Sequence, residues 1–246
     1  MSKKDISWKI DRLGALIRID EPVSIIGNEW AQLATGMDAD LEIPFNSEDP
    51  SKPLIIFTIL DKKKYVIGYF KERNFINIHL DFDEADISEV SEITHEVDNF
   101  YDSVKRLSTT YLSKSIVDLK LGIEMIDYIE TPTDGVKKLR NDFSYFSGID
   151  EDISEIDLKL KSSLITDDEV EVSKTIEFSN KTKLKIVVDS DIENSSTKNI
   201  ITADIELSVT EKDTGYINPV KNIDILKRSL LSIVKEELCY ESNIKE

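Results

Sequence analysis

The chain has 246 residues, of which 49 are acidic and 31 are basic, and its formal net charge is −18 at pH 7. This length is enough for one large domain or two ordinary ones, with a core that needs no disulfide or metal. With only 8 glycines and 6 prolines, collagenous and low-complexity classes are excluded. The acidic balance disfavours direct nucleic-acid binding, because such a surface repels phosphate backbones.

The cysteine content and the hydropathy pattern indicate a cytoplasmic protein. Cys239 is the single cysteine of the sequence, so no internal disulfide can form, and a lone thiol suits a reducing compartment. The first residues, Met-Ser-Lys-Lys-Asp-Ile-Ser-Trp, contain no apolar run after the lysines, so we expect no secretory signal. No stretch approaches the roughly 20 apolar residues of a spanning helix, so we expect no membrane association.

The first half of the chain is predicted to be rich in strands. Alternating apolar and polar residues, or short apolar runs bounded by turn residues, are typical of strands. The run 54–60 and the run 65–70 are separated by a short charged turn, which predicts a β-hairpin. Such patterns occur at residues 16–19, 54–60, 65–70, 75–82 and 116–130.

A long amphipathic helix is predicted over residues 87–112. Apolar residues recur there at three- and four-residue spacing, which places them on one face of a helix. Asp86 and Glu89 form a plausible capping pair at its start. The apolar stripe consists of Val90, Ile93, Val97, Phe100, Val104, Leu107 and Tyr111.

The second half is predicted to repeat this plan. Thr131-Pro-Thr-Asp-Gly135 is the clearest break in the chain, and Val136 to Phe146 has the spacing of a short helix. Residues 223–239 return to helical spacing at the end of the chain. Between these helices the alternation predicts four strands, at 156–160, 170–178, 184–188 and 201–209.

These elements predict an α+β fold of two similar lobes, each an antiparallel sheet covered by an amphipathic helix. The N-terminal lobe would comprise residues 1–130 and the C-terminal lobe residues 131–246. A local echo favours an internal duplication, because Val-Asp-Leu-Lys-Leu at 117–121 resembles Ile-Asp-Leu-Lys-Leu at 156–160. Two such lobes could share one sheet or face each other across a cleft.

The nucleophiles and bases form no recognisable catalytic pattern. His95 lies on the predicted long helix without the second histidine, four residues away, of a zinc-protease helix, so it is interpreted as a surface histidine. His79 lies on the polar side of a predicted strand. Cys239 follows a core position of the terminal helix, which favours a packing role over a nucleophilic one.

The acidic residues likewise suggest no definite metal site. Chance explains pairs at metal-ligand spacing in a chain with 49 acids, and none continues into a calcium-binding loop. The acid-x-lysine pattern of metal-dependent nucleases lacks a convincing partner acid. We therefore assign no catalytic, cofactor-binding or metal-ligating residue and expect no cofactor. The acid pairs are Asp38/Asp40, Asp81/Asp83 and Asp189/Asp191, and the acid-x-lysine patterns are Asp118-Leu-Lys120 and Asp157-Leu-Lys159.

The strand–helix–strand passage from Phe75 to Tyr128, together with the strand 202–209 and the helix 223–238, resembles a sporadically distributed bacterial protein family. That family has two lobes and no established function, and the resemblance covers about half of the chain through its hydrophobic pattern. It implies a two-lobed α+β fold and transfers no catalytic residue. The last strands and the terminal helix are also similar to acidic secretion chaperones, which are much shorter.

Three hypotheses of function remain open. The first is a non-catalytic protein-interaction or regulatory protein of the bacterial cytoplasm, including an inhibitor or a defence or anti-defence component that presents carboxylates to a partner with a basic surface. The second is a chaperone-like peptide-binding module that adds a client strand. The third is an enzyme of unrecognised type, which would gather His79 or His95 with two or more carboxylates in a cleft. Homo-oligomerisation is left open.

Overall fold

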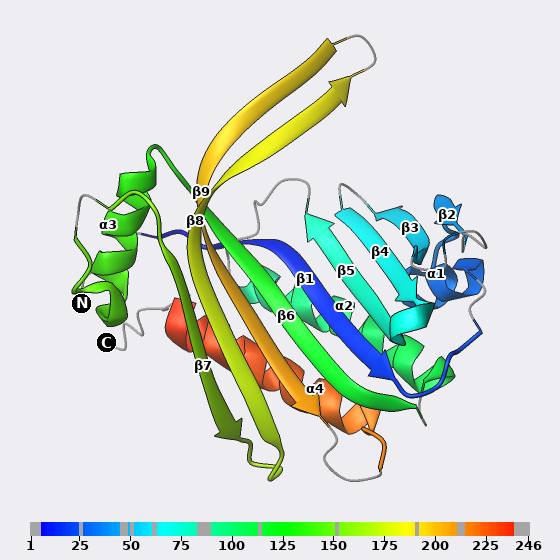
Figure 1. The fold of residues 1–246 in the computed structure, drawn as a ribbon. Helices are drawn as coiled ribbons and strands as arrows, with labels where there is room; N and C mark the ends of the chain where they lie inside the picture. The colour runs from blue at the N-terminus through cyan, green and yellow to red at the C-terminus, as the bar shows by residue number, and fades with distance from the viewer. Residues whose placement is uncertain are drawn as a thin grey trace.

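A computed structural model gives the fold of the chain and describes residues 6–24, 27–44, 49, 52–60, 63–82, 90–112, 115–150, 153–189, 192–210 and 215–238. The strands of these segments form one antiparallel sheet of nine, in the order β2-β3-β4-β5-β1-β6-β9-β8-β7. Figure 1 shows the two long helices behind this sheet, a shorter helix beside its left-hand end, and the other face turned to the viewer. The predicted α+β class is confirmed.

The nine strands range from 3 residues in β2 to 19 residues in β8 and β9. The strands are β1 (Lys9–Ile19), β2 (Leu41–Ile43), β3 (Leu54–Leu60), β4 (Lys63–Phe70), β5 (Phe75–Phe82), β6 (Ile116–Ile129), β7 (Asp157–Ile165), β8 (Glu171–Asp189) and β9 (Ile192–Thr210). The α-helices are α1 (Gly27–Thr35), α2 (Val90–Tyr111), α3 (Pro132–Asp142) and α4 (Pro219–Ile233). A π-helical turn, η3 (Val234–Leu238), continues α4.

Alternation of side chains divides the sheet into a buried face and an open face. On β6, Leu119, Leu121 and Ile123 are fully buried beneath the helices. The intervening residues Lys120 and Gly122 point to the opposite side, because successive residues of a strand face opposite ways. The predicted alternation in the strand 75–82 is likewise confirmed by the burial of every second residue of β5.

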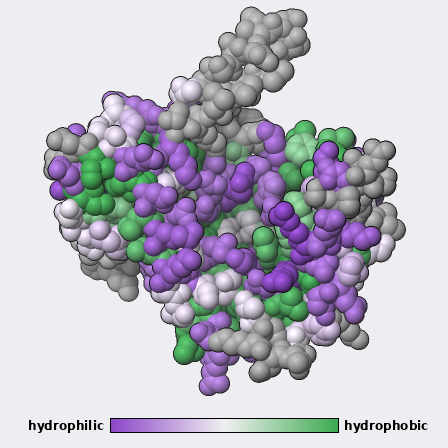
Figure 2. Space-filling model, in the orientation of Figure 1, coloured by the Kyte–Doolittle hydropathy of each residue, from purple (hydrophilic) through white to green (hydrophobic). Residues whose placement is uncertain are grey.

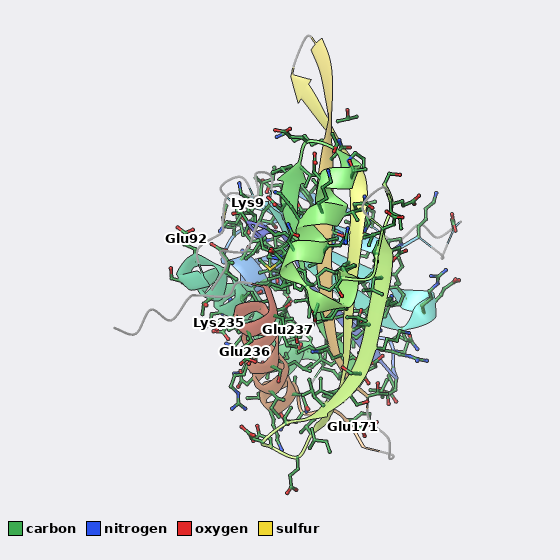
Figure 3. The ribbon with its side chains drawn as sticks, turned by 90° about the vertical axis from the view of Figure 1, so that its left-hand side faces the viewer. Lys9, Glu92, Glu171, Lys235, Glu236 and Glu237 are labelled. Carbon is green, nitrogen blue, oxygen red and sulfur yellow. The ribbon has the colours of Figure 1, made fainter. Side chains whose placement is uncertain are left out.

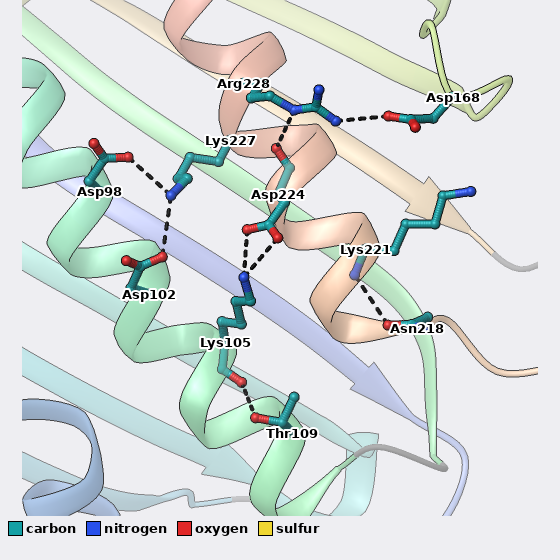
Figure 4. Close-up of polar contacts among 10 residues, drawn as sticks. All are labelled: Asp98, Asp102, Lys105, Thr109, Asp168, Asn218, Lys221, Asp224, Lys227 and Arg228. Carbon is teal, nitrogen blue, oxygen red and sulfur yellow. Dashed lines mark hydrogen bonds and ion pairs between the residues drawn. The ribbon is translucent and has the colours of Figure 1, made fainter.

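Ion pairs join the two long helices that cover the buried face. The Lys105 ammonium lies 2.7 Å from Asp224 of α4. Lys227 of α4 lies 3.0 Å from Asp98 and 3.2 Å from Asp102 of α2, so it bridges two turns of that helix (Figure 4). These partly exposed pairs set the relative position of the helices, while the apolar residues beneath them supply most of the stabilisation.

A buried tyrosine connects α2 to the centre of the sheet. The Tyr101 hydroxyl donates a hydrogen bond of 2.6 Å to the Gly122 carbonyl and lies 3.3 Å from the Gly14 carbonyl. Tyr101 is fully buried, and this burial raises the pKa of its phenol far above the ordinary range. From the helix-covered face of the sheet, the neutral hydroxyl thus contacts β1 and β6 where Gly14 and Gly122 are paired.

An aromatic cluster fills the space between α3 and the sheet. The rings of Phe143 and Phe178 lie 4.9 Å apart, and Phe146 meets Phe178 edge to face at 5.5 Å. Trp8 contacts Phe143 and Phe178 from the N-terminal segment. Figure 3 shows from the side how α3 lies along the end of the sheet, with Lys235, Glu236 and Glu237 beyond the last turn of α4.

The second half of the chain departs from its prediction in the number of strands. The runs predicted as separate strands at 170–178 and 184–188 belong to one 19-residue strand, β8. The strand predicted at 201–209 is also longer, because β9 begins at Ile192. Charged residues such as Lys181 and Lys183 interrupt the apolar pattern, although both lie within the β8–β9 ladder. Backbone pairing over a long hairpin explains the continuous strands.

The predicted helix boundaries and the predicted chain break need correction. The helix predicted at 223–239 begins at Pro219, and Asn218 caps its N-terminus by accepting a hydrogen bond from the Lys221 amide. The predicted break at 131–135 is the start of α3, where Thr131 and Asp134 form a capping box. Proline and glycine in this stretch indicated a loop, but a first-turn proline suits a helix start.

One predicted capping pair lies outside the described residues, and two short elements of the structure were not predicted. The expected capping pair of the long helix, Asp86 and Glu89, lies outside the described residues, and the described part of the helix is Val90–Tyr111. The first strand is longer than the predicted 16–19, since it begins at Lys9. The short elements α1 and β2 were not predicted, because neither has a long periodic pattern.

None of the helices in the described part of the chain combines the length and the apolar character that a bilayer crossing requires.

Replacement of Phe178 by alanine should test the role of the aromatic cluster. We expect Phe178→Ala to lower the free energy of unfolding by about 3–5 kcal/mol, because it leaves a cavity among several rings. Urea denaturation followed by circular dichroism measures the change. Leu41→Ala is the control, since Leu41 is 53% exposed and its loss should change stability little. A loss below about 1 kcal/mol for Phe178→Ala would contradict the packing.

Candidate functional site

The open face of the sheet carries a row of charged residues that crosses seven strands. Each member of this row is directly opposite the next one on the neighbouring strand, so the strand register places them together. We call it the charged row, and it consists of Lys64, Asp81, Arg12, Glu124, Asp204, Glu177 and Lys159, in the order of β4, β5, β1, β6, β9, β8 and β7.

Two ion pairs lie in the charged row, one on each side of its centre. Arg12 lies 2.5 Å from Asp81, and Lys159 lies 2.6 Å from Glu177. The lysine lowers the pKa of Glu177 mainly by donating a hydrogen bond to its carboxylate. The two residues between these pairs, Glu124 and Asp204, are both acidic.

Glu124 and Asp204 form an opposed like-charge pair on the two central strands β6 and β9. Burial raises the pKa of Glu124, and the negative charge of Asp204 raises it further. Burial also raises the pKa of Asp204. The positive charges of Arg12 and Lys181 lower the pKa values of both carboxyl groups, although neither cation forms an ion pair with them in the described part of the chain. Like charges opposite each other are destabilising, so this pair favours an external cation.

A hollow lies next to this acidic pair because two glycines face each other. Gly14 of β1 is directly opposite Gly122 of β6, and both occupy positions whose side chains would project to the open face. The hollow has a volume of about 210 Å³, and Arg12, Glu124 and Asp204 are among its lining residues. A Cβ atom at Gly14 would meet no atom within 4 Å, so packing within the chain does not require glycine there. A Cβ atom at Gly122 would instead lie 3.2 Å from the Ile205 carbonyl oxygen, so the close approach of the β9 backbone accounts for glycine there.

The edge of the open face beyond β4 is apolar instead of charged. Figure 2 shows hydrophilic residues over the middle of this face and hydrophobic ones towards β2 and β3. The apolar patch consists of Leu41, Ile43, Ile55, Phe57, Ile59 and Val66, which project to the open side of β2, β3 and β4. Leu41, Ile43 and Ile59 are each about half exposed. Contiguous exposed apolar side chains are typical of interaction surfaces.

The two histidines of the sequence lie on different parts of the molecule. His79 is on the open face, where its Nε2 atom lies 3.5 Å from Asp81, and burial lowers its pKa. His95 is on α2 and contacts the Asn99 amide at 3.0 Å. The structure therefore does not bring the histidines together, and His79 has one carboxylate in contact instead of the two or more that the enzyme hypothesis needs. Cys239 lies outside the described residues.

The acid pairs singled out in the sequence have structural partners where they are described. Asp38 accepts hydrogen bonds from Asn28 and Gln32, and Asp40 accepts one from the Ile59 amide. Asp83 and Asp191 lie outside the described residues, and so does the side chain of Asp189.

The acid-x-lysine patterns also form no cluster. Asp118 accepts a hydrogen bond from Thr210, and Lys120 pairs with Glu206 at 3.2 Å. Asp157 and Lys159 lie on the edge strand β7, three strands away from β6, which carries Asp118 and Lys120. Within the described segments, no group of three or more His, Cys, Asp or Glu side chains has the arrangement of a metal site.

Sequence reasoning did not identify Glu124, Asp204 or the glycine hollow. Gly122 was visible as a small residue within an alternating strand, but its partner Gly14 is more than 100 residues away in the sequence. The register that opposes them depends on the pairing of β1 with β6. An isolated glycine in a predicted strand was the only available signal.

Comparison of the chain with protein-family models, with curated proteins and with solved structures gave no match. The resemblance to a two-lobed bacterial family therefore stays a prediction.

Neutralising either member of the opposed acidic pair should stabilise the protein at pH 7. Because both carboxyl groups have raised pKa values in the folded chain, their ionisation costs stability as pH rises above the ordinary values of 3.8 for Asp204 and 4.5 for Glu124. We expect Glu124→Gln or Asp204→Asn to add about 0.2–1 kcal/mol to the free energy of unfolding at pH 7. The gain should vanish near about pH 3, where the native carboxyls are neutral.

Glu177→Gln is the matched control for this pH experiment, because the pKa of Glu177 is lowered by Lys159. This substitution removes a favourable contact, so it should give no gain at pH 7. Thermal unfolding at several pH values measures all three variants. A loss of stability in both Glu124→Gln and Asp204→Asn at pH 7 would show that the two charges already have a compensating partner.

Proposed function

We propose that the protein is a non-catalytic interaction protein, regulatory or inhibitory, whose open sheet face binds a positively charged protein surface. The observation that carries this proposal is the opposed pair Glu124 and Asp204 beside the hollow at Gly14 and Gly122. A lysine or arginine of a partner that entered the hollow would reach both carboxylates. It would relieve their mutual repulsion and form charge-assisted hydrogen bonds.

The electrostatics of the whole chain favour such a partner. A net charge of −18 attracts basic proteins over long range and raises their association rate. The same charge opposes direct contact with nucleic acid and opposes pairing of two open faces. A basic groove of the kind that holds nucleic acid is one suitable partner surface. The bacterial cytoplasm stays the proposed compartment.

Strand register supports a specific contact. Glu124 is half-buried and Asp204 is exposed, so water still reaches both carboxylates. The pairing of β6 with β9 holds the two residues directly opposite each other, so one partner cation can contact both carboxylates.

A peptide-binding module is the second candidate. The strand β7 is an edge strand and pairs only with β8, so one side of it can accept a client strand. A pocket of about 360 Å³ lies between the end of β7 and α4, with Leu164, Ile225 and Ile233 in its lining. Lys159 and Lys161 on β7 oppose uncontrolled pairing of this edge. These lysines favour acidic clients, and Lys159 is also the last member of the charged row.

We also propose that the two halves of the sheet arose by duplication, as the predicted lobes require. In each half the first strand pairs with the last, since β1 pairs with β5 and β6 pairs with β9. The orders β3-β4-β5-β1 and β7-β8-β9-β6 correspond, and each half ends in a long helix, α2 or α4. This arrangement favours a boundary just before β6 instead of at residue 130.

Binding to a cationic probe should depend on salt and on the opposed acidic pair. We expect an arginine-rich peptide to bind the native chain with an affinity that falls steeply between about 50 and about 300 mM salt, because the Debye length shortens from roughly 14 Å to roughly 6 Å over this range. The double variant Glu124→Gln/Asp204→Asn should bind about tenfold more weakly at low salt, because two adjacent carboxylates that one cation can contact are lost. Isothermal titration calorimetry measures both effects.

The control for this experiment removes the same number of charges elsewhere. Glu72→Gln/Glu155→Gln replaces two exposed glutamates outside the charged row and leaves the same net charge as the test variant. It should weaken binding far less. Equal weakening in the two double variants would mean that only the overall charge matters, and it would overturn the assignment of the site.

A further inference from the structure

The open face connects its apolar patch to its acidic pair through the glycine hollow. One row of directly opposed residues runs from β2 to β7, and it begins with the apolar residues Leu41, Phe57 and Val66. The row continues through His79 and the two facing glycines to Glu206, and then through Thr175 to Lys161. The two glycines leave the hollow between the apolar patch and the acidic residues of β6 and β9.

The backbone of this surface has no free hydrogen-bonding groups to offer. Every strand from β3 to β9 in the sheet order has a hydrogen-bonded neighbour on both sides. An extended peptide lying across these strands would leave its own amides and carbonyls without protein partners. An α-helix satisfies its own backbone, so it is the segment that such a face can accept.

We infer that the partner segment is an amphipathic α-helix with apolar residues in one half and lysine or arginine in the other. This inference rests on the proposed function and adds the chemistry of the partner. Charge complementarity supports it, because Glu124 and Asp204 line the hollow without an ion pair in the described segments, and the apolar patch lies on β2, β3 and β4 beyond it. The other charged residues of the lining, Arg12, Lys120 and Glu206, are already ion-paired. A second copy of this chain does not fit, because its net charge of −18 repels the same face.

The dimensions of the sheet set the length of this helix. Five inter-strand spacings separate β3 from β9, which amounts to about 24 Å at a spacing of about 4.8 Å. A helix rises about 1.5 Å per residue, so about 16 residues span the distance. The predicted partner segment is thus a helix of about four turns that crosses the strands over Gly14 and Gly122.

Two synthetic peptides of about 16 residues test the inference. Both have the same composition, but one separates its apolar and basic residues into two halves and the other interleaves them. We expect the separated peptide to bind the native chain at least about tenfold more tightly, as measured by isothermal titration calorimetry. Equal affinities for the two peptides would overturn the helix proposal.

Protein variants locate the contact on the open face. Gly14→Leu places a side chain in the hollow without changing charge, and Gly148→Leu is its control because both positions have open space around the Cβ atom. Leu41→Ser/Ile43→Ser removes two half-exposed residues of the apolar patch. Gly14→Leu and the double serine variant should each weaken binding of the separated peptide by roughly tenfold, and Gly148→Leu should not.

The outcomes separate this inference from the proposed function. If Glu124→Gln/Asp204→Asn weakens binding of the separated peptide while Gly14→Leu and Leu41→Ser/Ile43→Ser do not, the cationic contact stands and the helix proposal fails. If Glu124→Gln/Asp204→Asn also leaves the affinity unchanged, both fail. Circular dichroism of the bound peptide provides an independent check, since a peptide that stays unfolded on binding contradicts a docked helix.

Discussion

The antiparallel pairing of β1 with β6 is the interaction on which the rest of the structure depends. It joins the strands of both halves of the chain into one nine-stranded sheet. Tyr101 supports this junction from below through its hydrogen bond to Gly122. Without the pairing, β1 and β6 would be exposed edges, and the charged row would be divided into two unrelated pieces.

Helix placement on one side of the sheet follows from the apolar side chains that this pairing aligns. Fully buried residues such as Leu13 and Leu121 share the covered face, while Arg12 and Glu124 share the open face. A slip of one residue in the register would exchange these faces and bury the charges. The same constraint that builds the core therefore assembles the open face, so stability and the proposed binding surface are linked through a single register.

The open face contains a local conflict that folding tolerates. Glu124 and Asp204 are opposed with raised pKa values, and two central strands carry glycines that weaken them. Departures of this kind from stable design are expected at functional sites. The paired ends of the charged row, at Arg12–Asp81 and Lys159–Glu177, show that the same face elsewhere satisfies its charges. Arg12 and Lys181 offset the central negative charges only in part, since both pKa values are still raised, and a cationic partner would add to them.

The sequence by itself determined the acidic character, the α+β class and most strands and helices, because local periodicity reports which side of each element is buried. It placed the strand 75–82 correctly, and it missed α1 and β2, whose patterns are too short. Only the tertiary structure decided that Gly14 faces Gly122 and that Glu124 faces Asp204. Those neighbours are distant in the sequence, and their contact depends on strand order and register, which backbone hydrogen bonds between distant segments establish.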